Sequence, residues 1–358
     1  MKLVFLYGGT GAGKTTAIAR VASVLFKERK LFKILINRKS GYSVDYTYFQ
    51  QQELDVSSYP HACISCAITG FADLLTAVLQ QQQYDFVLVE IEQCCKDIQI
   101  GVIQPLLKRF PGLSIGAFQF QDARSVYEQL NKGTYILKLK RAVESLSHLN
   151  RHRYIVLTKK DLLTTGQLNR LQYLLAQQFP ENQVLLQNSH IESDICDWLN
   201  AINRRDTEQN SDVFSENYLL LGEDRSAGWY EAGFEFNGPE AGRAVRLFIQ
   251  RFNRRVIRKE FVTEHTKVLV YTGNTVEKIS FSWGDIPISF PRFTSGMQSV
   301  KVLINSRNNG VANSLGRIIE RILSKIETSL EVVITALPAR ENGPEFLCQV
   351  YKAENYVS

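Results

Sequence analysis

The sequence has few cysteines and no long apolar run, and each absence narrows the class of protein. Six cysteines among 358 residues are too few for a disulfide framework. No apolar run approaches the ~20 residues that a membrane-spanning helix requires. The apolar run after Met1 and Lys2 is also shorter than the central region of a signal peptide. We therefore expect a cytoplasmic protein without a membrane partner.

Concentrated basic charge is scarce as well. The net charge of +6 is spread over many segments, and the densest basic stretch is 254–259. Only Phe252 and Phe261 flank this stretch and no aromatic residue lies within it, so a solvated helix end explains it better than a nucleic-acid site. A hydrophobic fraction of 44% and a charged fraction of 22% are ordinary for a globular protein. We expect no nucleic-acid partner.

The most informative segment that is present is rich in glycine. Residues 8–15 have the G-x-x-x-x-G-K-[ST] spacing of a phosphate-binding loop, between an apolar strand pattern and the helical pattern 16–26. In such loops the backbone N–H groups surround the phosphates, the lysine reaches the β- and γ-phosphates, and the hydroxyl binds Mg²⁺. The residues predicted to bind the nucleotide here are Gly8, Gly9, Thr10, Gly11, Ala12, Gly13, Lys14, Thr15 and Thr16.

Strand and helix patterns alternate over residues 1–203. This alternation predicts an α/β fold, a P-loop NTPase with a mostly parallel sheet and helices on both faces. Ligands of such sheets bind at the carboxyl ends of the strands. The predicted strands are 2–7, 32–37, 84–90, 114–120, 153–158 and 183–187. Helical patterns between them include 71–82, 101–110 and 165–179.

A polar stretch without periodicity separates this part from a second pattern. We interpret residues 204–227 as a linker and 228–358 as a smaller α+β domain. The elements predicted in that domain are strands 230–236, 266–272, 277–283, 299–305 and 330–336 and helices 239–254 and 312–327.

The strand at 154–157 ends in a motif that favours guanine. Thr158, Lys159 and Asp161 have the [NT]-K-x-D spacing, in which the aspartate accepts from guanine and the lysine stem covers the base. Adenine would leave that carboxylate unpaired, so the sequence predicts GTP rather than ATP. The segment 187–189, after the next strand, is a weaker candidate for the other side of the base.

Closely spaced thiols indicate a metal site. Cys63 and Cys66 have a C-x-x-C spacing that suits two ligands of a tetrahedral Zn²⁺ or another transition metal. His61, and one of Cys94 or Cys95, are candidates for further ligands. Buried free cysteines that pack as small hydrophobic residues are the alternative.

In their order along the chain, these motifs resemble the CobW family of P-loop GTPases, which serve as metallochaperones and in metallocofactor maturation. The resemblance covers about the first 200 residues, and the matching segments are 8–15, 37–45, 62–66, 89–93, 121–123 and 158–161. It implies a GTPase that couples its nucleotide state to delivery of a zinc- or cobalamin-type metal or metallocofactor. The implied partner is a client metalloprotein or a cofactor-dependent enzyme, and a homodimer is compatible with it.

The resemblance also assigns two carboxylates to the phosphate end of the site. Glu90 aligns with the family's glutamate, which would hold the water shell of Mg²⁺ or polarise the attacking water. The predicted catalytic residues are therefore Lys14 and Glu90. Asp45, on the expected first switch segment, is a second candidate for the Mg²⁺ shell, with Thr15 as the hydroxyl ligand. Both carboxylates have an ordinary solvated surface role as the alternative.

Three residues depart from the family pattern. Arg38 replaces an acidic residue, Ser65 replaces a cysteine, and Gln93 replaces a glycine that would sense the γ-phosphate. Arg38 and Gln93 favour an alternative, a nucleotide-gated binding protein with slow hydrolysis that docks a partner through its C-terminal domain. A small-molecule kinase is less favoured, because the sequence has no arginine-rich segment that would close over an acceptor.

Overall fold

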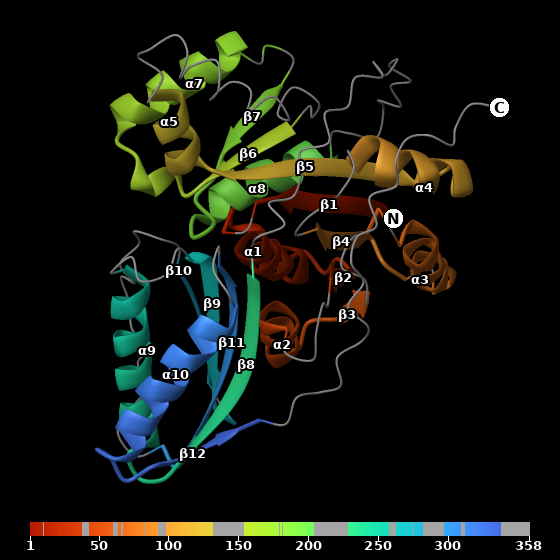
Figure 1. Ribbon diagram of the computed structural model, residues 1–358. Coiled ribbons are helices and arrows are strands. Elements are labelled where there is room, and N and C mark those ends of the chain that lie inside the picture. The colour runs from red at the N-terminus through yellow and green to blue at the C-terminus, as the bar shows by residue number, and fades with distance from the viewer. Residues whose placement is uncertain are drawn as a thin grey trace, which may run out of the picture.

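Two sheets organise the computed structural model of the chain, as Figure 1 shows. In the described residues, the first sheet has seven strands that all pair in parallel. The second has five strands that all pair antiparallel. The predicted α/β fold followed by a smaller α+β unit is therefore confirmed. The structure describes residues 1–9, 11–37, 43–59, 64–65, 67–81, 83–91, 98–131, 154–178, 180, 182–203, 228–257, 263–273, 275–281, 297–308 and 312–337.

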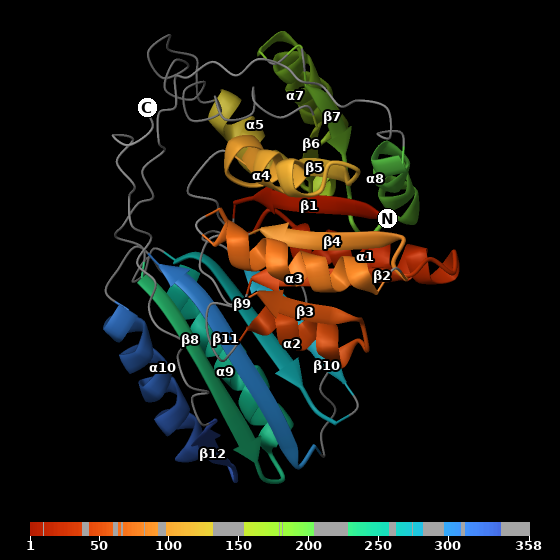
Figure 2. The same ribbon diagram turned by 90° about the vertical axis from the view of Figure 1, so that its right-hand side faces the viewer.

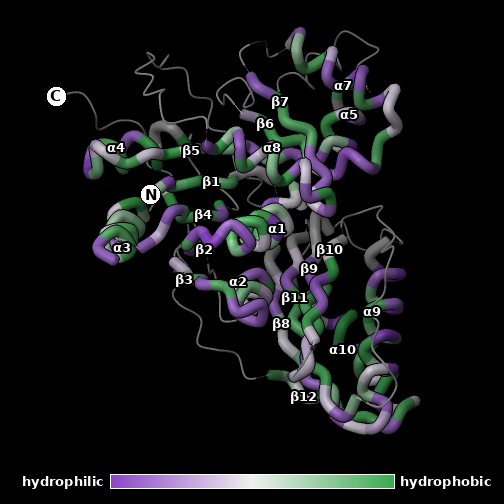
Figure 3. The backbone as a smooth tube through the Cα atoms, turned by 180° about the vertical axis from the view of Figure 1, so that it is seen from behind, coloured by the Kyte–Doolittle hydropathy of each residue, from purple (hydrophilic) through white to green (hydrophobic). Residues whose placement is uncertain are grey.

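The first sheet has the strand order β3-β2-β4-β1-β5-β6-β7. Its strands are β1 (Lys2–Gly8), β2 (Phe32–Asn37), β3 (Val56–Tyr59), β4 (Phe86–Ile91), β5 (Ser114–Asp122), β6 (Tyr154–Thr158) and β7 (Gln183–Leu186). The central strands are apolar on both faces, as buried parallel strands are. Figure 3 shows this hydrophobic character along β1, β4 and β6.

Helices cover both faces of the first sheet. The helices are α1 (Lys14–Lys27), α2 (Val44–Gln51), α3 (Ile68–Gln80), α4 (Gln104–Arg109), α5 (Ala123–Asn131), α7 (Thr165–Gln178) and α8 (Glu192–Asn203). One face packs on α1 and α8, and the opposite face packs on α3 and α4. Figure 2 shows α3 and α4 in front of the sheet.

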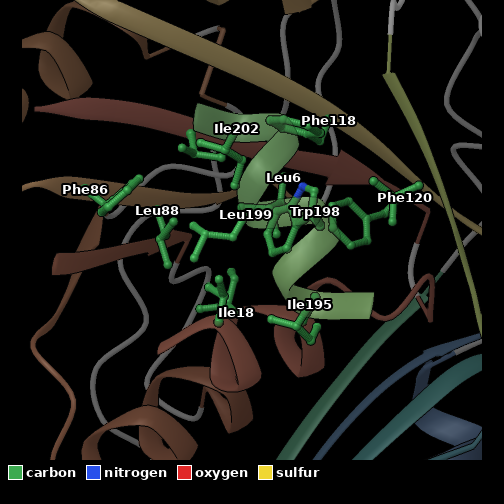
Figure 4. Packing of buried hydrophobic residues seen from close by; sticks show 14 of the residues in the cluster. Leu6, Ile18, Phe86, Leu88, Phe118, Phe120, Ile195, Trp198, Leu199 and Ile202 are labelled. Carbon is green, nitrogen blue, oxygen red and sulfur yellow. The ribbon is translucent and has the colours of Figure 1, made fainter. Parts of the chain in front are cut away.

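A tryptophan fixes α8 on the sheet. The ring of Trp198 lies edge-on to Phe118 and Phe120, with centroid distances of 5.8 and 5.3 Å. Figure 4 shows this ring between the two phenylalanines of β5, with Ile18 of α1 on the other side of the cluster. Aromatic edge-to-face pairs of this kind add about 0.5–1.5 kcal/mol to the burial of the rings. The packing holds β5, and hence the strand ends beside the phosphate loop, in place.

The second sheet presents a different partner on each of its faces. It contains β8 (Gly228–Asn237), β9 (Thr263–Tyr271), β10 (Val276–Phe281), β11 (Ser299–Asn308) and β12 (Val333–Ala336), with helices α9 (Ala241–Ile257) and α10 (Ala312–Glu327). One face packs on α9 and α10. The opposite face contacts α2 of the first unit, and Figures 1 and 2 both show α2 beside this sheet. None of the helices in the described residues combines the length and apolar character that a membrane crossing demands.

Several elements differ from their predicted bounds. Helix α2 and strand β3 lie between the predicted strands 32–37 and 84–90, in segments whose sequence predicted neither a helix nor a strand. The predicted helix 101–110 is a π-helical turn over Gln99–Ile103 followed by α4, because Pro105 lacks the N–H of a regular helix. The predicted linker 204–227 lies outside the described residues.

Candidate functional site

The phosphate loop (residues 8–15) joins the end of β1 to the start of α1. The Lys14 side chain is buried, and its Nζ donates to the carbonyl oxygens of Gly8 at 2.9 Å and Gly9 at 3.0 Å. Thr10 lies outside the described residues. The structure therefore places the lysine over the loop itself, where the phosphates of a nucleotide would lie.

Two glycines of the loop are required by its geometry. Gly8 has φ +140°, and a Cβ atom there would lie 2.1 Å from the carbonyl oxygen of Phe120. Gly13 has φ +83°, and a Cβ atom there would lie 3.3 Å from the Thr158 side chain. Only glycine adopts such backbone conformations at little cost. The spacing of the motif thus has a direct steric cause.

The N-terminus of α1 has no side-chain cap. Gly13 precedes the helix and provides no side-chain cap, and the first turn has no acidic residue. The first N–H groups of a helix have no partner within it, and the helix dipole places positive potential there. This end of α1 therefore has the chemistry of a phosphate site.

A hydroxyl and a carboxylate meet beside the loop. Thr15 Oγ1 donates to Glu90 Oε1 at 2.8 Å, and both residues are buried. The register of β1 on β4 pairs Leu6 with Glu90, which brings the end of β4 beside the loop. The second carboxylate oxygen, Oε2 of Glu90, is buried without a hydrogen-bond partner in the part of the chain that the structure describes.

This pair fits a magnesium ion. Mg²⁺ takes oxygen ligands, usually from one or two side chains together with waters and substrate phosphates. Burial raises the pKa of the Glu90 carboxyl above its ordinary value, and the negative charge of Asp45 raises it further. A cation beside Glu90 would remove that penalty by stabilising the ionised form.

Asp45 lies in the first turn of α2, after the capping residue Ser43. The carboxylate of Asp45 forms ion pairs of 2.5 Å with both Lys267 of β9 and Lys278 of β10. Burial alone would raise the pKa of Asp45, but the two ammonium groups outweigh it and hold the pKa well below its ordinary value. The structure thus places Asp45 between the two units, and its predicted role at Mg²⁺ stays a prediction.

The base loop (residues 158–161) lies next to the phosphate loop. Thr158 is buried, and its hydroxyl donates to the carbonyl oxygen of Ala12 at 2.9 Å. Lys159 adopts φ +56°, and its Nζ forms an ion pair of 2.7 Å with Asp122 at the end of β5. Asp161 follows in a 3₁₀ turn with its side chain exposed. The predicted base-binding residues therefore lie together at the carboxyl ends of β5 and β6.

A second pair of contacts supports the base loop from the far side. The backbone N–H of Lys160 donates to the carbonyl oxygen of Gln187 at 3.3 Å. The carboxylate of Asp194 accepts from the Lys160 ammonium at 2.8 Å and from the Asn188 N–H at 2.6 Å. The segment 187–189 thus flanks the base loop, as its place after β7 indicated.

The predicted thiolate site falls outside the described residues. Cys63, Cys66, His61, Cys94 and Cys95 all belong to segments that the structure does not describe, as do Arg38 and Gln93. Among the described residues, no group of three or more histidine, cysteine or acidic side chains could hold a metal ion. The transition-metal site therefore stays a prediction.

Sequence reasoning missed three residues that the structure joins to the site. Asp122 appeared only as part of a family motif, although its position at a strand end before a helix was a usable signal. Lys267 and Lys278 carried no signal, because they lie on strands more than 200 residues from Asp45 in the chain. Only the packing of the two units brings them to this carboxylate.

Comparison with known proteins gives similarity in structure alone. No protein-family model matches the chain, and no curated protein matches its sequence. The nickel-bound HypB of Helicobacter pylori has a TM-score of 0.41 and 16% identity, over 60% of this chain and 92% of that one. The Zn(II)-bound YjiA GTPase of E. coli has a TM-score of 0.32 and 14% identity, over 91% of this chain and 98% of that one. The cell division protein FtsY of Thermotoga maritima has a TM-score of 0.37 and 16% identity, over 54% of this chain and 63% of that one.

Proposed function

We propose that this chain binds GTP together with Mg²⁺ and hydrolyses it. The observation that carries the proposal is the junction of β1, α1 and β4. There the buried Lys14, the helix N-terminus without a side-chain cap and the Thr15–Glu90 pair at 2.8 Å occur together. A lysine, a hydroxyl and a carboxylate in this arrangement match the needs of phosphoryl transfer, which depends on positioning and on stabilising charge.

Each of these groups has a role in that reaction. The loop N–H groups and Lys14 would hold the β- and γ-phosphates and stabilise the negative charge that builds up as the terminal bond breaks. Bound Mg²⁺ would neutralise charge on the same phosphates, with Thr15 and Glu90 as its protein ligands, directly or through water. Burial keeps water away from these interactions and so strengthens them.

The base loop would select guanine over adenine. The exposed carboxylate of Asp161 would accept hydrogen bonds from the guanine N1–H and amino group, and the stem of Lys159 would cover the base. Adenine lacks both donors in that position, so the hydrogen bonds to this charged group, worth about 1.5–3 kcal/mol each, are not made. We therefore expect a preference for GTP over ATP of roughly tenfold or more.

Titration calorimetry tests this part of the proposal. GTP, GDP and ATP are added in turn to the full chain with Mg²⁺, and phosphate release from GTP is followed separately. We expect binding of both guanine nucleotides, weaker binding of ATP, and slow but measurable release of phosphate. The absence of heat with every nucleotide would refute the site.

We further propose that the nucleotide state controls delivery of a metal or metallocofactor to a client protein. Support comes from the C-x-x-C spacing of Cys63 and Cys66 and from the family resemblance of the motifs. Uptake of Zn²⁺ and Co²⁺ by the wild type and by Cys66→Ser tests this step, with the half-buried Cys196→Ser as a matched control. Equal uptake by all three proteins would remove the metal from the proposal.

One observation favours a second function, a nucleotide-gated docking protein with little catalysis. In the part of the chain that the structure describes, the ion pairs of Asp45 are with lysines of the C-terminal sheet. In this case the triphosphate would mainly change a surface that a partner binds. Single-turnover hydrolysis separates the two, because a docking protein retains bound GTP unchanged for far longer than a GTPase does.

A further inference from the structure

The residue between the two proposed base contacts is tied to helix α8. Lys160 lies between Lys159 and Asp161 in the base loop, and its ammonium donates to Asp194 Oδ1 at 2.8 Å and lies 2.7 Å from Oδ2. The side chains of Asp194 and Lys160 are 10% and 27% exposed, so solvent screens this ion pair less than one on the surface. The structure therefore gives a fixed partner to a residue that the proposed recognition of guanine does not use.

The same carboxylate holds the segment on the other side of the base loop. The backbone N–H of Asn188 donates to Asp194 Oδ2 at 2.6 Å. The backbone carbonyl oxygen of Asn188 accepts from the N–H of Ile191 at 2.9 Å, and its side-chain oxygen accepts from the N–H of His190 at 2.9 Å. The turn before α8 is thus closed on itself and held by Asp194.

The backbone joins the two segments as well. The N–H of Lys160 donates to the carbonyl oxygen of Gln187 at 3.3 Å, and the N–H of Gln187 donates to that of Leu157 at 2.8 Å. These bonds continue the parallel pairing of β6 with β7 beyond the strand ends. Hydrogen bonds to an ionised carboxylate are roughly twice as strong as neutral ones, so Asp194 contributes more to this connection than a backbone pair does.

The base loop needs such support, because its backbone is strained. Lys159 has φ +56°, in the left-handed region. A residue with a Cβ atom adopts this region at a cost, and only where its surroundings hold it there. The turn separates the Lys159 side chain, which pairs with Asp122, from the carboxylate of Asp161 in the 3₁₀ turn that follows. A loop freed from Asp194 can relax, and the two proposed base contacts would then lose their relative placement.

Helix α8 is a firm anchor for this hold. Its Trp198 packs edge-on against two phenylalanines of β5. Ile195, next to Asp194, belongs with Ile18 of α1 to the core cluster that Figure 4 shows. Because α1 begins at the phosphate loop, Asp194 ties the base loop to the pair of helices that also carries the phosphate loop.

We propose that Asp194 is a positioning residue that sets the preference for guanine. The proposal rests on the nucleotide binding proposed above. Through Lys160, Asp194 holds Lys159 and Asp161 where a purine base meets both of them. Asp194 itself does not contact the base.

Titration calorimetry of the full chain in Mg²⁺ tests this role by comparing GTP with ATP. Asp194→Asn keeps the size of the side chain but removes the charge that holds Lys160. We expect the ratio of GTP to ATP affinity to fall about 3- to 10-fold, with ATP affinity within about twofold of the wild type, because the phosphates bind at another loop. A fall in both affinities at an unchanged ratio would show a merely structural role and overturn the proposal.

A second variant removes the other half of the ion pair. Lys160→Met keeps the stem of the side chain and the backbone N–H that pairs with Gln187. The ratio of GTP to ATP affinity should fall by about the same factor as in Asp194→Asn. A fall in Asp194→Asn alone would overturn the route through Lys160.

Glu192→Gln is the matched control. Glu192 is the other acidic residue in the first turn of α8, and its carboxylate pairs with Lys27 of α1 at 2.7 Å and not with the base loop. Both carboxylates stabilise the helix N-terminus, so both variants lose this general contribution. The affinity ratio should stay at the wild-type value in Glu192→Gln. Equal falls in Glu192→Gln and Asp194→Asn would overturn a specific role for Asp194.

A double variant tests whether Asp194 acts through Asp161. If it does, its effect on the affinity ratio must vanish once Asp161→Asn has removed the carboxylate that accepts from guanine. We therefore expect Asp161→Asn, alone and combined with Asp194→Asn, to have ratios within about twofold of each other. Effects that add in full would mean that Asp194 acts on the base by another route, which contradicts the proposal.

Hydrogen–deuterium exchange without nucleotide gives a readout that does not depend on affinity. In Asp194→Asn, exchange in the base loop should rise above that of the wild type. Exchange in β1 and β5 should match the wild type, which establishes that the variant is folded. Unchanged protection of the base loop would show that Asp194 does not hold it.

The outcomes separate the two proposals. A wild type that binds no nucleotide refutes the proposed function. A wild type that binds nucleotide without preferring GTP refutes the selection of guanine, and the role of Asp194 with it. A wild type that prefers GTP, with an Asp194→Asn variant of equal preference, refutes the positioning role alone.

Discussion

The two ends of the proposed nucleotide site are built in different ways. At the base end, Thr158, Lys159 and Asp122 contact one another or the phosphate loop within the first unit. At the magnesium end, Glu90 is buried beside Thr15, and Asp45 is engaged by lysines of the second unit. One end is complete within a single parallel sheet, and the other depends on how two sheets meet. The two ends therefore differ in whether the second unit contributes to them.

The largest effect should come from a residue that serves both ends. Lys14→Ala removes the buried ammonium that would hold the β- and γ-phosphates, and charged hydrogen bonds of this kind are worth about 1.5–3 kcal/mol each. We expect calorimetry to show affinity for GTP and ATP reduced by about 100-fold or more. Lys27→Ala, on the exposed side of the same helix, should leave binding unchanged. Equal affinity of the Lys14 variant and the wild type would mean that the phosphates bind elsewhere.

A change confined to the base end should alter selectivity without altering the magnesium requirement. In Asp161→Asn, an amide replaces the carboxylate that accepts from guanine, and the mismatch costs about 1–3 kcal/mol. The ratio of GTP to ATP affinity should fall by roughly tenfold or more. Asp197→Asn, an exposed carboxylate on α8, provides the control. A GTP preference that survives Asp161→Asn would place guanine recognition on another residue.

The magnesium end should make the stability of the protein depend on pH. The pKa of Glu90 is raised above its ordinary value of 4.5, so the folded protein binds the proton more tightly than the unfolded chain does. This contribution to stability is complete below pH 4.5 and is lost as the pH rises through the raised pKa. Without nucleotide, wild-type stability should therefore fall with rising pH by up to about 1.4 kcal/mol per pH unit relative to Glu90→Gln.

Urea unfolding at a series of pH values measures this difference. The exposed Glu192→Gln variant, on α8, should follow the wild type. Addition of Mg²⁺ and GTP should flatten the wild-type curve, because a cation stabilises the ionised carboxylate. Parallel curves for the wild type and Glu90→Gln would show that Glu90 does not titrate in this range.

The smallest effect should come from the ion pair at the base end. Asp122→Asn removes the pairing with Lys159, whose side chain is 34% exposed, so the loss should be about 1 kcal/mol or less. The asparagine still accepts from the N–H groups of Arg124 and Ser125, and α5 should therefore stay capped. GTP affinity should fall less than about fivefold, with Asp73→Asn as the surface control. A loss as large as that of Asp161→Asn would give Asp122 a direct contact with the base.

The features that could be predicted from the sequence are those that depend on residues close together in the chain. The phosphate loop follows from the glycines and the lysine in one short segment, and the structure shows the steric reason at Gly8. The parallel sheet follows from apolar strands that alternate with helix patterns. The placement of Thr158 and Lys159 followed in turn, because the carboxyl ends of parallel strands meet at one edge.

What the sequence did not predict depends on contacts between distant segments. Helix α2 packs on the first unit and also on the second sheet. Its buried residues therefore do not form one strong apolar stripe in the sequence. Lys267 and Lys278 have the residue type of a solvated strand face, but in the structure both are paired with Asp45 of α2 and nearly buried. The cluster around Asp45 could not be inferred from residue spacing.

The hydrogen bond from the Thr158 hydroxyl to the carbonyl oxygen of Ala12 has one more consequence. It joins the segment proposed to bind the base to the segment proposed to bind the phosphates, so the distance between the two proposed subsites would be fixed before a nucleotide binds. A ligand whose base and phosphates are spaced differently from those of a nucleoside triphosphate would therefore fit the two subsites poorly.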